Sequence, residues 1–109
     1  MEARVLALAE QLLLIERELR TLGFWTVEPP SAEALASVQP FCVDTMSLEA
    51  WLQWLFLPRM KLLLETDGPL PSASGIREMA DVCYRGREAE VRGLLRELEK
   101  FDQLIQGAV

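Results

Sequence analysis

The chain lacks the side chain on which much proton-transfer and metal chemistry depends, because none of its 109 residues is a histidine. Ser/His/Asp and Cys/His nucleophile systems and imidazole metal sites are therefore excluded. The two cysteines, Cys42 and Cys83, have no metal-ligand spacing and are too few for a disulfide framework, so we expect free thiols. No glycine-rich loop of the kind that binds phosphate occurs, and the sequence predicts no cofactor.

Carboxylates are the remaining candidates for acid or base chemistry, and Asp44 in "FCVDTM" is the strongest of them. Its neighbours are apolar, and desolvation by such neighbours can raise the pKa of a carboxyl group. The simpler interpretation is that Asp44, or Thr45, binds backbone N–H groups of a loop. Because too few catalytic groups accompany Asp44, a carboxylate enzyme or small-ligand binder is the weakest of the functional hypotheses.

Charge argues against a protein that binds nucleic acid by itself. Asp and Glu number 17 against 11 Lys and Arg, and the net charge is −6, whereas phosphate binding needs surplus positive charge. An acidic chain can still attract a basic protein. Four basic residues fall at intervals of seven, four and four, which places them along one side of a helix: Arg85, Arg92, Arg96 and Lys100. This stripe is either a solvated face or an RNA-facing surface within a larger complex.

Hydrophobic periodicity predicts four helices, over residues 3–22, 47–65, 74–84 and 88–106. Gly23 is placed to end the first helix and Ser47 to cap the second. No strand pattern occurs. Apolar stripes on four helices can be buried only against one another, so we expect an all-α, four-helix bundle-like domain that spans residues 1–109.

The segment 24–46 separates the first two helices and contains Pro29, Pro30 and Pro40, which forbid a continuous helix. A short helix is predicted within it, with Ser31 as N-cap. A connection of this length is unusual unless it packs or has a function. We expect it to pack over the helices, because it also contains large apolar residues.

The stretch "WLQWLFLPRM", residues 51–60, is the most apolar part of the chain. Pro58 lies inside the second helix and cannot donate a hydrogen bond to the carbonyl of Trp54, so a kink is predicted between them. Only Gln53 is polar between Trp51 and Leu57, and a helix that is apolar on every side must be covered. Either the 24–46 segment covers it, or a docking patch remains, since Trp and Arg are favoured in interface hot spots. The candidate docking residues are Phe41, Asp44, Trp51, Trp54, Phe56, Pro58 and Arg59.

No apolar run approaches the ~20 residues that a membrane-spanning helix needs. Acidic residues interrupt the leucines of the N-terminal segment, which is unlike a secretory signal. The sequence therefore predicts a cytoplasmic protein without a membrane partner.

The block "QPFCVDTMSLEAWLQWLFLPRM", residues 39–60, closely resembles the signature of the YqcC-like family of small bacterial proteins. A leucine-rich first helix, "PLP" at 69–71 and "LLRELEKFDQLI" near the end extend the resemblance over nearly the whole chain. The resemblance implies an all-α fold and no assigned enzymatic activity, so no catalytic residue is carried over. The motif positions are Gln39, Pro40, Phe41, Asp44, Thr45, Met46, Trp51, Trp54, Pro58, Arg59 and Met60.

The resemblance also implies a partner, because genes of this family lie beside the gene of a tRNA pseudouridine synthase. The leading hypothesis is a non-enzymatic adaptor or accessory subunit that docks through residues 39–60 and assists tRNA binding or the stability of such a synthase. The alternative is a self-associating protein that hides the same apolar patch in a homodimer.

Overall fold

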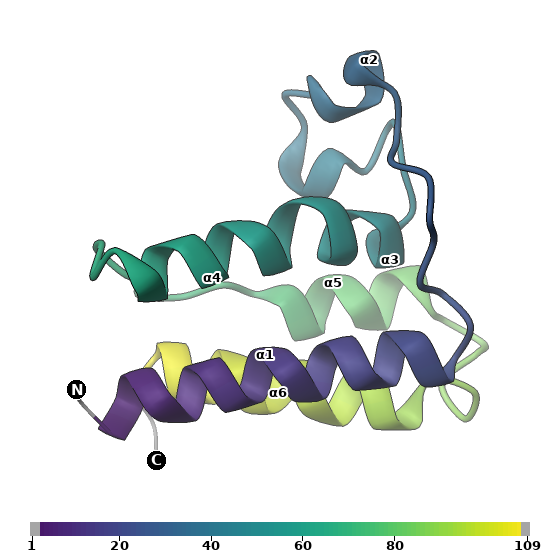
Figure 1. Ribbon diagram of the computed structural model, residues 1–109. Coiled ribbons are helices and arrows are strands. Elements are labelled where there is room, and N and C mark those ends of the chain that lie inside the picture. Colours follow the sequence, from purple (N-terminus) through teal and green to yellow (C-terminus); the bar gives the residue numbers. More distant parts are fainter. Residues whose placement is uncertain (1–2, 108–109) are drawn as a thin grey trace.

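The computed structural model describes residues 3–107, and these residues form helices, turns and loops without a strand (Figure 1). Two further helical turns, a 3-10 turn at Pro40–Cys42 and a π-helical turn at Leu52–Phe56, accompany the α-helices. The all-α prediction is confirmed. No helix of this part of the chain has both the length and the apolarity of a membrane span. The α-helices are α1 (Ala3–Thr21), α2 (Ala32–Leu35), α3 (Leu48–Trp51), α4 (Leu57–Glu65), α5 (Ile76–Cys83) and α6 (Arg92–Ile105).

The long middle helix, called the rod below, consists of α3, the π turn and α4, and it runs from Leu48 to Glu65. Its N-terminus is capped as predicted, because the N–H of Ala50 donates to the hydroxyl of Ser47 at 3.2 Å. In the π turn, the N–H of Leu57 donates to the carbonyl of Leu52, five residues back. Pro58, which has no N–H, follows this widened turn. The irregularity expected between Trp54 and Pro58 thus takes the form of a π turn that begins at Leu52.

The core lies between the rod, α5 and an antiparallel pair formed by α1 and α6 (Figure 1). The guanidinium of Arg4, at the start of α1, donates to the carbonyls of Leu104 and Ile105 at the end of α6. A cation there satisfies free carbonyls and interacts favourably with the helix dipole. Both ends of the described chain therefore lie together. The fully buried apolar residues of this pair include Leu8, Leu12, Ile15, Leu19, Leu94, Leu98, Phe101 and Ile105.

Helix α5 is capped from a neighbouring helix. It begins after Gly75, which has a left-handed φ of 66° and offers no side chain to its free N–H groups. Buried Asp102 of α6 accepts a hydrogen bond from the N–H of Arg77 at 2.9 Å and another from the hydroxyl of Ser74. A carboxylate at this place also interacts favourably with the helix dipole. Asp102 therefore fixes where α5 meets α6.

Helix α6 begins at Arg92 rather than at the predicted Glu88. Residues 88–91 form turns instead. The guanidinium of Arg87 binds both carboxylate oxygens of Glu90, at 3.2 and 3.1 Å, and the N–H of Glu90 donates to the carbonyl of Arg87 at 3.0 Å. These bonds stabilise a tight turn in place of a first helical turn.

The 24–46 segment packs on the helices at its ends and projects from them in between. Phe24 and Trp25 lie against the core. Residues 31–46 then form a lobe that stands away from the rod in Figure 1. The lobe is closed on itself, because the hydroxyl of Thr45 donates to the carbonyl of Ala34 at 2.8 Å. Within the lobe, the side chain of Val38 is 92% exposed, whereas Phe41 packs against the core, so the expected packing holds for only part of the segment.

Replacement of Asp102 by Ala should destabilise the fold by about 1–3 kcal/mol, because it leaves the N–H of Arg77 and the hydroxyl of Ser74 without their acceptor. Urea denaturation followed by circular dichroism measures this change. Glu99→Ala is the matched control on the same helix, because Glu99 is exposed and, among residues 3–107, pairs only with Arg77, at 3.2 Å. Its effect should stay within about 0.5 kcal/mol. An Asp102→Ala effect no larger than that of the control contradicts the capping role.

Candidate docking surface

A groove of about 530 Å³ opens along one side of the rod. The rod forms one wall from Trp51 to Leu63, and the connection 69–74 forms the other. Pro40 and Phe41 of the lobe close one part of it, while Phe101 and Ile76 belong to the buried core beneath. We call this site the aromatic groove.

A series of aromatic rings links the groove to the core. The ring of Phe41 meets Trp51 edge-on with centroids 4.9 Å apart, Trp51 stacks on Phe56 at 5.5 Å, and Phe56 meets Phe101 of α6 at 4.9 Å. Phe41 adopts this position with a left-handed φ of 58°, and Cys42 follows with φ of 50°. Such a backbone is costly for bulky residues and persists only where the surroundings fix it. The position of Phe41 over Trp51 is therefore strongly determined.

The opposite side of the rod is covered by the 24–46 segment through Thr26. The N–H of Thr26 donates to Oε1 of Gln53 at 2.9 Å, and Nε2 of Gln53 donates back to the carbonyl of Thr26 at 2.7 Å. The indole N–H of Trp54 donates to the hydroxyl of Thr26 at 3.1 Å. Gln53, the one polar residue between Trp51 and Leu57, is thus buried with its amide group paired on both sides.

The groove brings together some of the predicted docking residues and separates others. Phe41, Trp51, Phe56 and Arg59 line it, although Phe56 is buried and contributes only to its base. Trp51 and Trp54 are both partly exposed, but Trp54 lies on the Thr26 side. Exposed Pro58 lies outside the groove as well. Exposed Asp44 accepts a hydrogen bond from the hydroxyl of Ser37 at 2.5 Å, so it lacks the apolar burial on which the enzyme hypothesis depends.

Arg59 is the charged residue of the groove lining, and its side chain is exposed at the rim. It forms no ion pair with any residue between positions 3 and 107. Two residues further on, Lys61 binds Glu16 of α1 at 3.3 Å. An arginine beside an apolar surface is thus left available for an external carboxylate.

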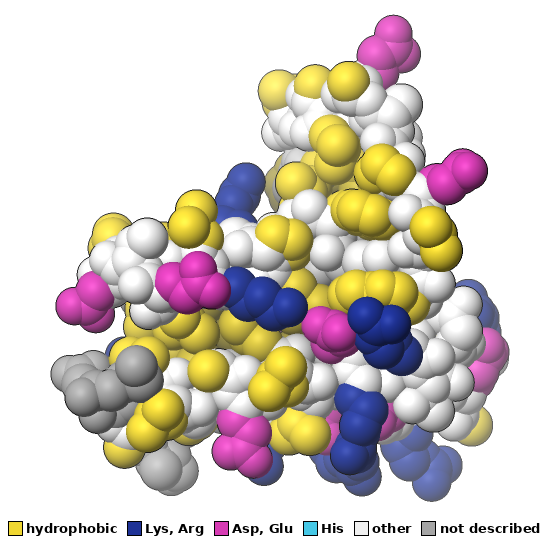
Figure 2. Space-filling view, viewed as in Figure 1, with side chains coloured by type: hydrophobic (Ala, Val, Ile, Leu, Met, Phe, Trp, Pro, Cys, Tyr) yellow, Lys and Arg dark blue, Asp and Glu magenta, His cyan; other side chains and the backbone are white. Residues whose placement is uncertain are grey.

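Sequence reasoning missed the far wall of the groove and the exposed leucines at the end of the rod. The family resemblance includes "PLP" at 69–71, but the wall itself was not expected, although two prolines keep a chain extended enough to line a helix. At the end of the rod, Leu62 is 59% exposed and Leu63 and Leu64 are partly exposed. Figure 2 shows apolar atoms gathered along the junction of α1 and α4 and on the lobe. Exposed apolar side chains therefore extend beyond the predicted patch at Trp51, Trp54 and Phe56 to the end of α4.

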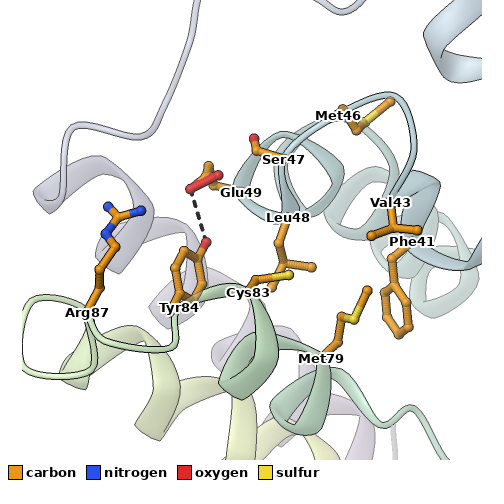
Figure 3. A pocket seen from close by; sticks show the side chains of 10 residues that line it. All are labelled: Phe41, Val43, Met46, Ser47, Leu48, Glu49, Met79, Cys83, Tyr84 and Arg87. Carbon is orange, nitrogen blue, oxygen red and sulfur yellow. Dashed lines mark hydrogen bonds between the residues drawn. The ribbon is translucent and has the colours of Figure 1, made fainter.

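A second pocket, of about 220 Å³, lies between the start of α3 and α5 (Figure 3). The hydroxyl of buried Tyr84 donates to the Glu49 carboxylate at 3.1 Å, and burial, then the charge of Glu49, raises the pKa of Tyr84 above its ordinary value. Burial and the same carboxylate raise the pKa of the Cys83 thiol, which makes it a poor nucleophile. Neither group is activated for catalysis. The described residues also contain no cluster of three His, Cys, Asp or Glu that could bind a metal.

The predicted basic stripe is exposed but lies among carboxylates. Arg85 belongs to the turn before α6, whereas Arg92, Arg96 and Lys100 lie on the helix itself. Nε of Arg96 is 3.8 Å from Glu97. A shallow pocket at Arg92 and Arg96 is also lined by three acidic residues, Asp81, Glu88 and Glu99. These carboxylates lower the positive potential along the stripe.

Comparison with protein families shows that residues 7–104 match the family model DUF446, described as "tRNA pseudouridine synthase C". A Pectobacterium carotovorum protein named "tRNA pseudouridine synthase C" is 53% identical over 83 residues, which are 76% of this chain and 22% of that protein. An uncharacterized Haemophilus influenzae protein is 45% identical over 86 residues, which are 79% of this chain and 80% of that protein.

An uncharacterized Escherichia coli protein, YqcC, is 36% identical over 94 residues, which are 86% of each chain. The solution NMR structure of E. coli YqcC has a TM-score of 0.86 and 31% sequence identity, with 99% of this chain and 92% of that chain covered. The present chain spans about a fifth of the length of the Pectobacterium protein, so about four fifths of that protein lies outside the match.

The buried hydroxyl of Tyr84 leads to a prediction about the stability of the protein at alkaline pH. The pKa of Tyr84 is raised in the folded state, so the folded protein keeps this proton more strongly than the unfolded chain does. The resulting contribution to the free energy of unfolding is complete below the ordinary tyrosine pKa of about 10 and is lost as the pH rises past it. The free energy of unfolding should fall there by up to about 1.4 kcal/mol per pH unit, and Tyr84→Phe should remove this part of the slope. Tyrosinate absorbance reports Tyr84 alone, because the chain has one tyrosine. A titration midpoint near 10 in the folded protein contradicts the burial of this hydroxyl.

Proposed function

We propose, from the premise that this chain belongs to the YqcC-like family (DUF446), that it is a non-enzymatic accessory subunit of a tRNA pseudouridine synthase. The family is shown by the match over residues 7–104 and by the E. coli relative, of which this chain covers 86%. The proposed docking surface is the aromatic groove. The proposed location of the protein is the cytoplasm, where tRNA is modified.

The aromatic groove is the observation that carries this proposal. Phe41, Trp51 and Arg59 come from the 39–60 block, and they converge on an apolar depression that the described part of the chain leaves open. Aromatic and arginine side chains around such a depression are typical of binding hot spots. The groove lining contains one charged group and no acid–base pair, which supports binding rather than catalysis.

The Pectobacterium relative supports the choice of partner. Its name is that of the synthase, and this chain matches only 22% of it. We assign the named activity to the part outside the match, because the present chain has neither a histidine nor an activated nucleophile in either pocket. The H. influenzae and E. coli relatives are matched over 80% and 86% of their own lengths. The same unit thus occurs as a small part of a protein named for the synthase and as most of two shorter proteins. This distribution is expected of a subunit that binds the synthase.

Charge and mass action supply a mechanism for assistance. The net charge of −6 favours encounter with a basic, tRNA-binding surface of the synthase. A subunit that binds only the folded synthase raises the stability of that enzyme in proportion to the logarithm of its own concentration. Within the complex, Arg92, Arg96 and Lys100 would bind phosphates that the isolated acidic chain cannot hold.

Trp51→Ala should weaken binding to the synthase of the same cell by about tenfold or more, because it removes the central ring of the groove. Isothermal titration with both purified proteins measures the Kd, and circular dichroism checks that helicity is kept. Trp54→Ala is the comparison variant, since it removes a partly exposed indole of the same rod that lies outside the groove. Its Kd should stay within about threefold of wild type.

Failure of wild type to bind the synthase refutes the accessory role. Binding that survives Trp51→Ala unchanged places the docking surface elsewhere. Light scattering on the chain alone tests the homodimer alternative, because a dimer that Trp51→Ala converts into monomers would favour self-association over the accessory role.

The basic stripe is tested separately with the triple variant Arg92→Ala, Arg96→Ala, Lys100→Ala. We expect no binding of tRNA by the isolated chain at physiological salt, and a weaker, less salt-dependent binding of tRNA by the complex that contains the variant. The slope of log Kd against log salt should fall by about one for each phosphate that the variant no longer binds. An unchanged slope identifies the stripe as a solvated face.

A further inference from the structure

The dimensions of the aromatic groove select the kind of segment that it can receive. The rod lines it from Trp51 to Leu63, which is about 18 Å at the rise of an α-helix, or about three turns. The opposite wall, residues 69–74, is an irregular connection that lies beside the rod. Strand addition needs a free sheet edge, and residues 3–107 contain no strand. A helix laid into the groove is the recognition mode that this shape allows.

The chemistry of the groove favours an apolar face on that helix. Phe41, Trp51, Leu63 and Leu70 present carbon surface, and the hydroxyl of Ser74 is already committed to Asp102. A polar metabolite would therefore find few hydrogen-bond partners. Large apolar side chains at helical spacing would instead replace water along the groove.

Arg59 adds a requirement for negative charge. Acidic residues outnumber basic ones in this chain, yet Arg59 has no ion-pair partner among residues 3–107, whereas its neighbour Lys61 binds Glu16. An unpaired guanidinium at the rim of an apolar groove is complementary to a carboxylate at the edge of an apolar helix face. The charge therefore sets the orientation of the incoming helix.

The position of the chain ends is consistent with a partner that is tethered in one relative. Leu63 and Leu70 line the groove and also an adjoining pocket of about 310 Å³, to which Arg4 and Val5 of α1 contribute. Arg4 in turn binds the end of α6. Polypeptide added at either end, as in a protein of which this chain matches 22%, would leave beside the groove and could enter it through a short linker.

We infer that the aromatic groove receives an amphipathic helix of the synthase, whose apolar face packs on Trp51 and Leu63 and whose carboxylate pairs with Arg59. This inference rests on the accessory function proposed above and specifies the segment that is recognised. A cross-linking experiment identifies the segment. A photo-activatable residue in place of Leu70, in the otherwise wild-type chain, is mixed with the purified synthase of the same cell and cross-linked peptides are sequenced.

The expected product is one peptide of the synthase with apolar residues at helical spacing and an Asp or Glu on the flank of that face. Cross-links confined to peptides without this pattern overturn the inference.

A charge exchange gives the second test. Arg59→Glu should raise the Kd for the synthase about tenfold or more, and replacement of the cross-linked carboxylate by Arg should restore binding of that variant. Arg17→Glu is the matched control, since Arg17 is exposed on α1, away from the groove, and approaches Glu18 only to 4.0 Å. It should change the Kd by no more than about threefold.

The outcomes separate the two proposals. The inference that a helix with a carboxylate binds Arg59 is refuted if Arg59→Glu does not weaken binding, or if the charge-reversed pair does not bind. Neither result contradicts the accessory function. Absence of wild-type binding refutes the accessory function itself.

Discussion

The stretch from Trp51 to Leu57 is apolar on nearly every side and must be covered, and the structure covers two of its sides with other parts of the chain. On one side, Leu52, Phe56 and Leu57 are buried in the core. The 24–46 segment covers the opposite side, where Gln53 forms two hydrogen bonds with Thr26. A buried amide without these partners would cost about 1–3 kcal/mol, so the same residue that interrupts the apolar stretch also fixes the segment that covers it. The third side, toward the 69–74 connection, is left as the aromatic groove.

The lobe follows from this arrangement. After Thr26 the chain must leave one side of the rod and return to its start at Ser47, on the way to placing Phe41 over Trp51. Two consecutive residues with left-handed φ make that return possible, at an energetic cost that edge-on and stacked rings offset. Phe41 lines both the aromatic groove and the Tyr84 pocket, so its conformation couples the shapes of the two. Strain of this kind is concentrated in the block that the family resemblance singles out.

Local sequence patterns predicted the helices well. The features that these patterns did not predict depend on contacts between residues far apart in the sequence or on competing local hydrogen bonds. The periodic leucines of α1 and the hydroxyl of Ser47 act within one helix, so the sequence pattern contains them. The start of α6 depends on the bonds between Arg87 and Glu90, which compete with a first helical turn. The cap of α5 comes from Asp102, on another helix, and no local pattern announces it. The aromatic groove is of the same kind, because its two walls are brought together only by the return of the chain from α4 to α5.

The two contexts of this unit place different demands on the aromatic groove. In a protein where the partner belongs to the same polypeptide, as proposed for the Pectobacterium relative, docking is intramolecular and the effective concentration can reach the millimolar range, so weak contacts suffice. A separate chain must instead offset the loss of translational and rotational freedom through the groove alone. A large aromatic surface held rigid by strain and ring stacking lowers the ordering cost of binding, and an unpaired Arg59 adds specificity to that surface. The separate form therefore depends on Trp51 and Arg59 more strongly than the joined form does.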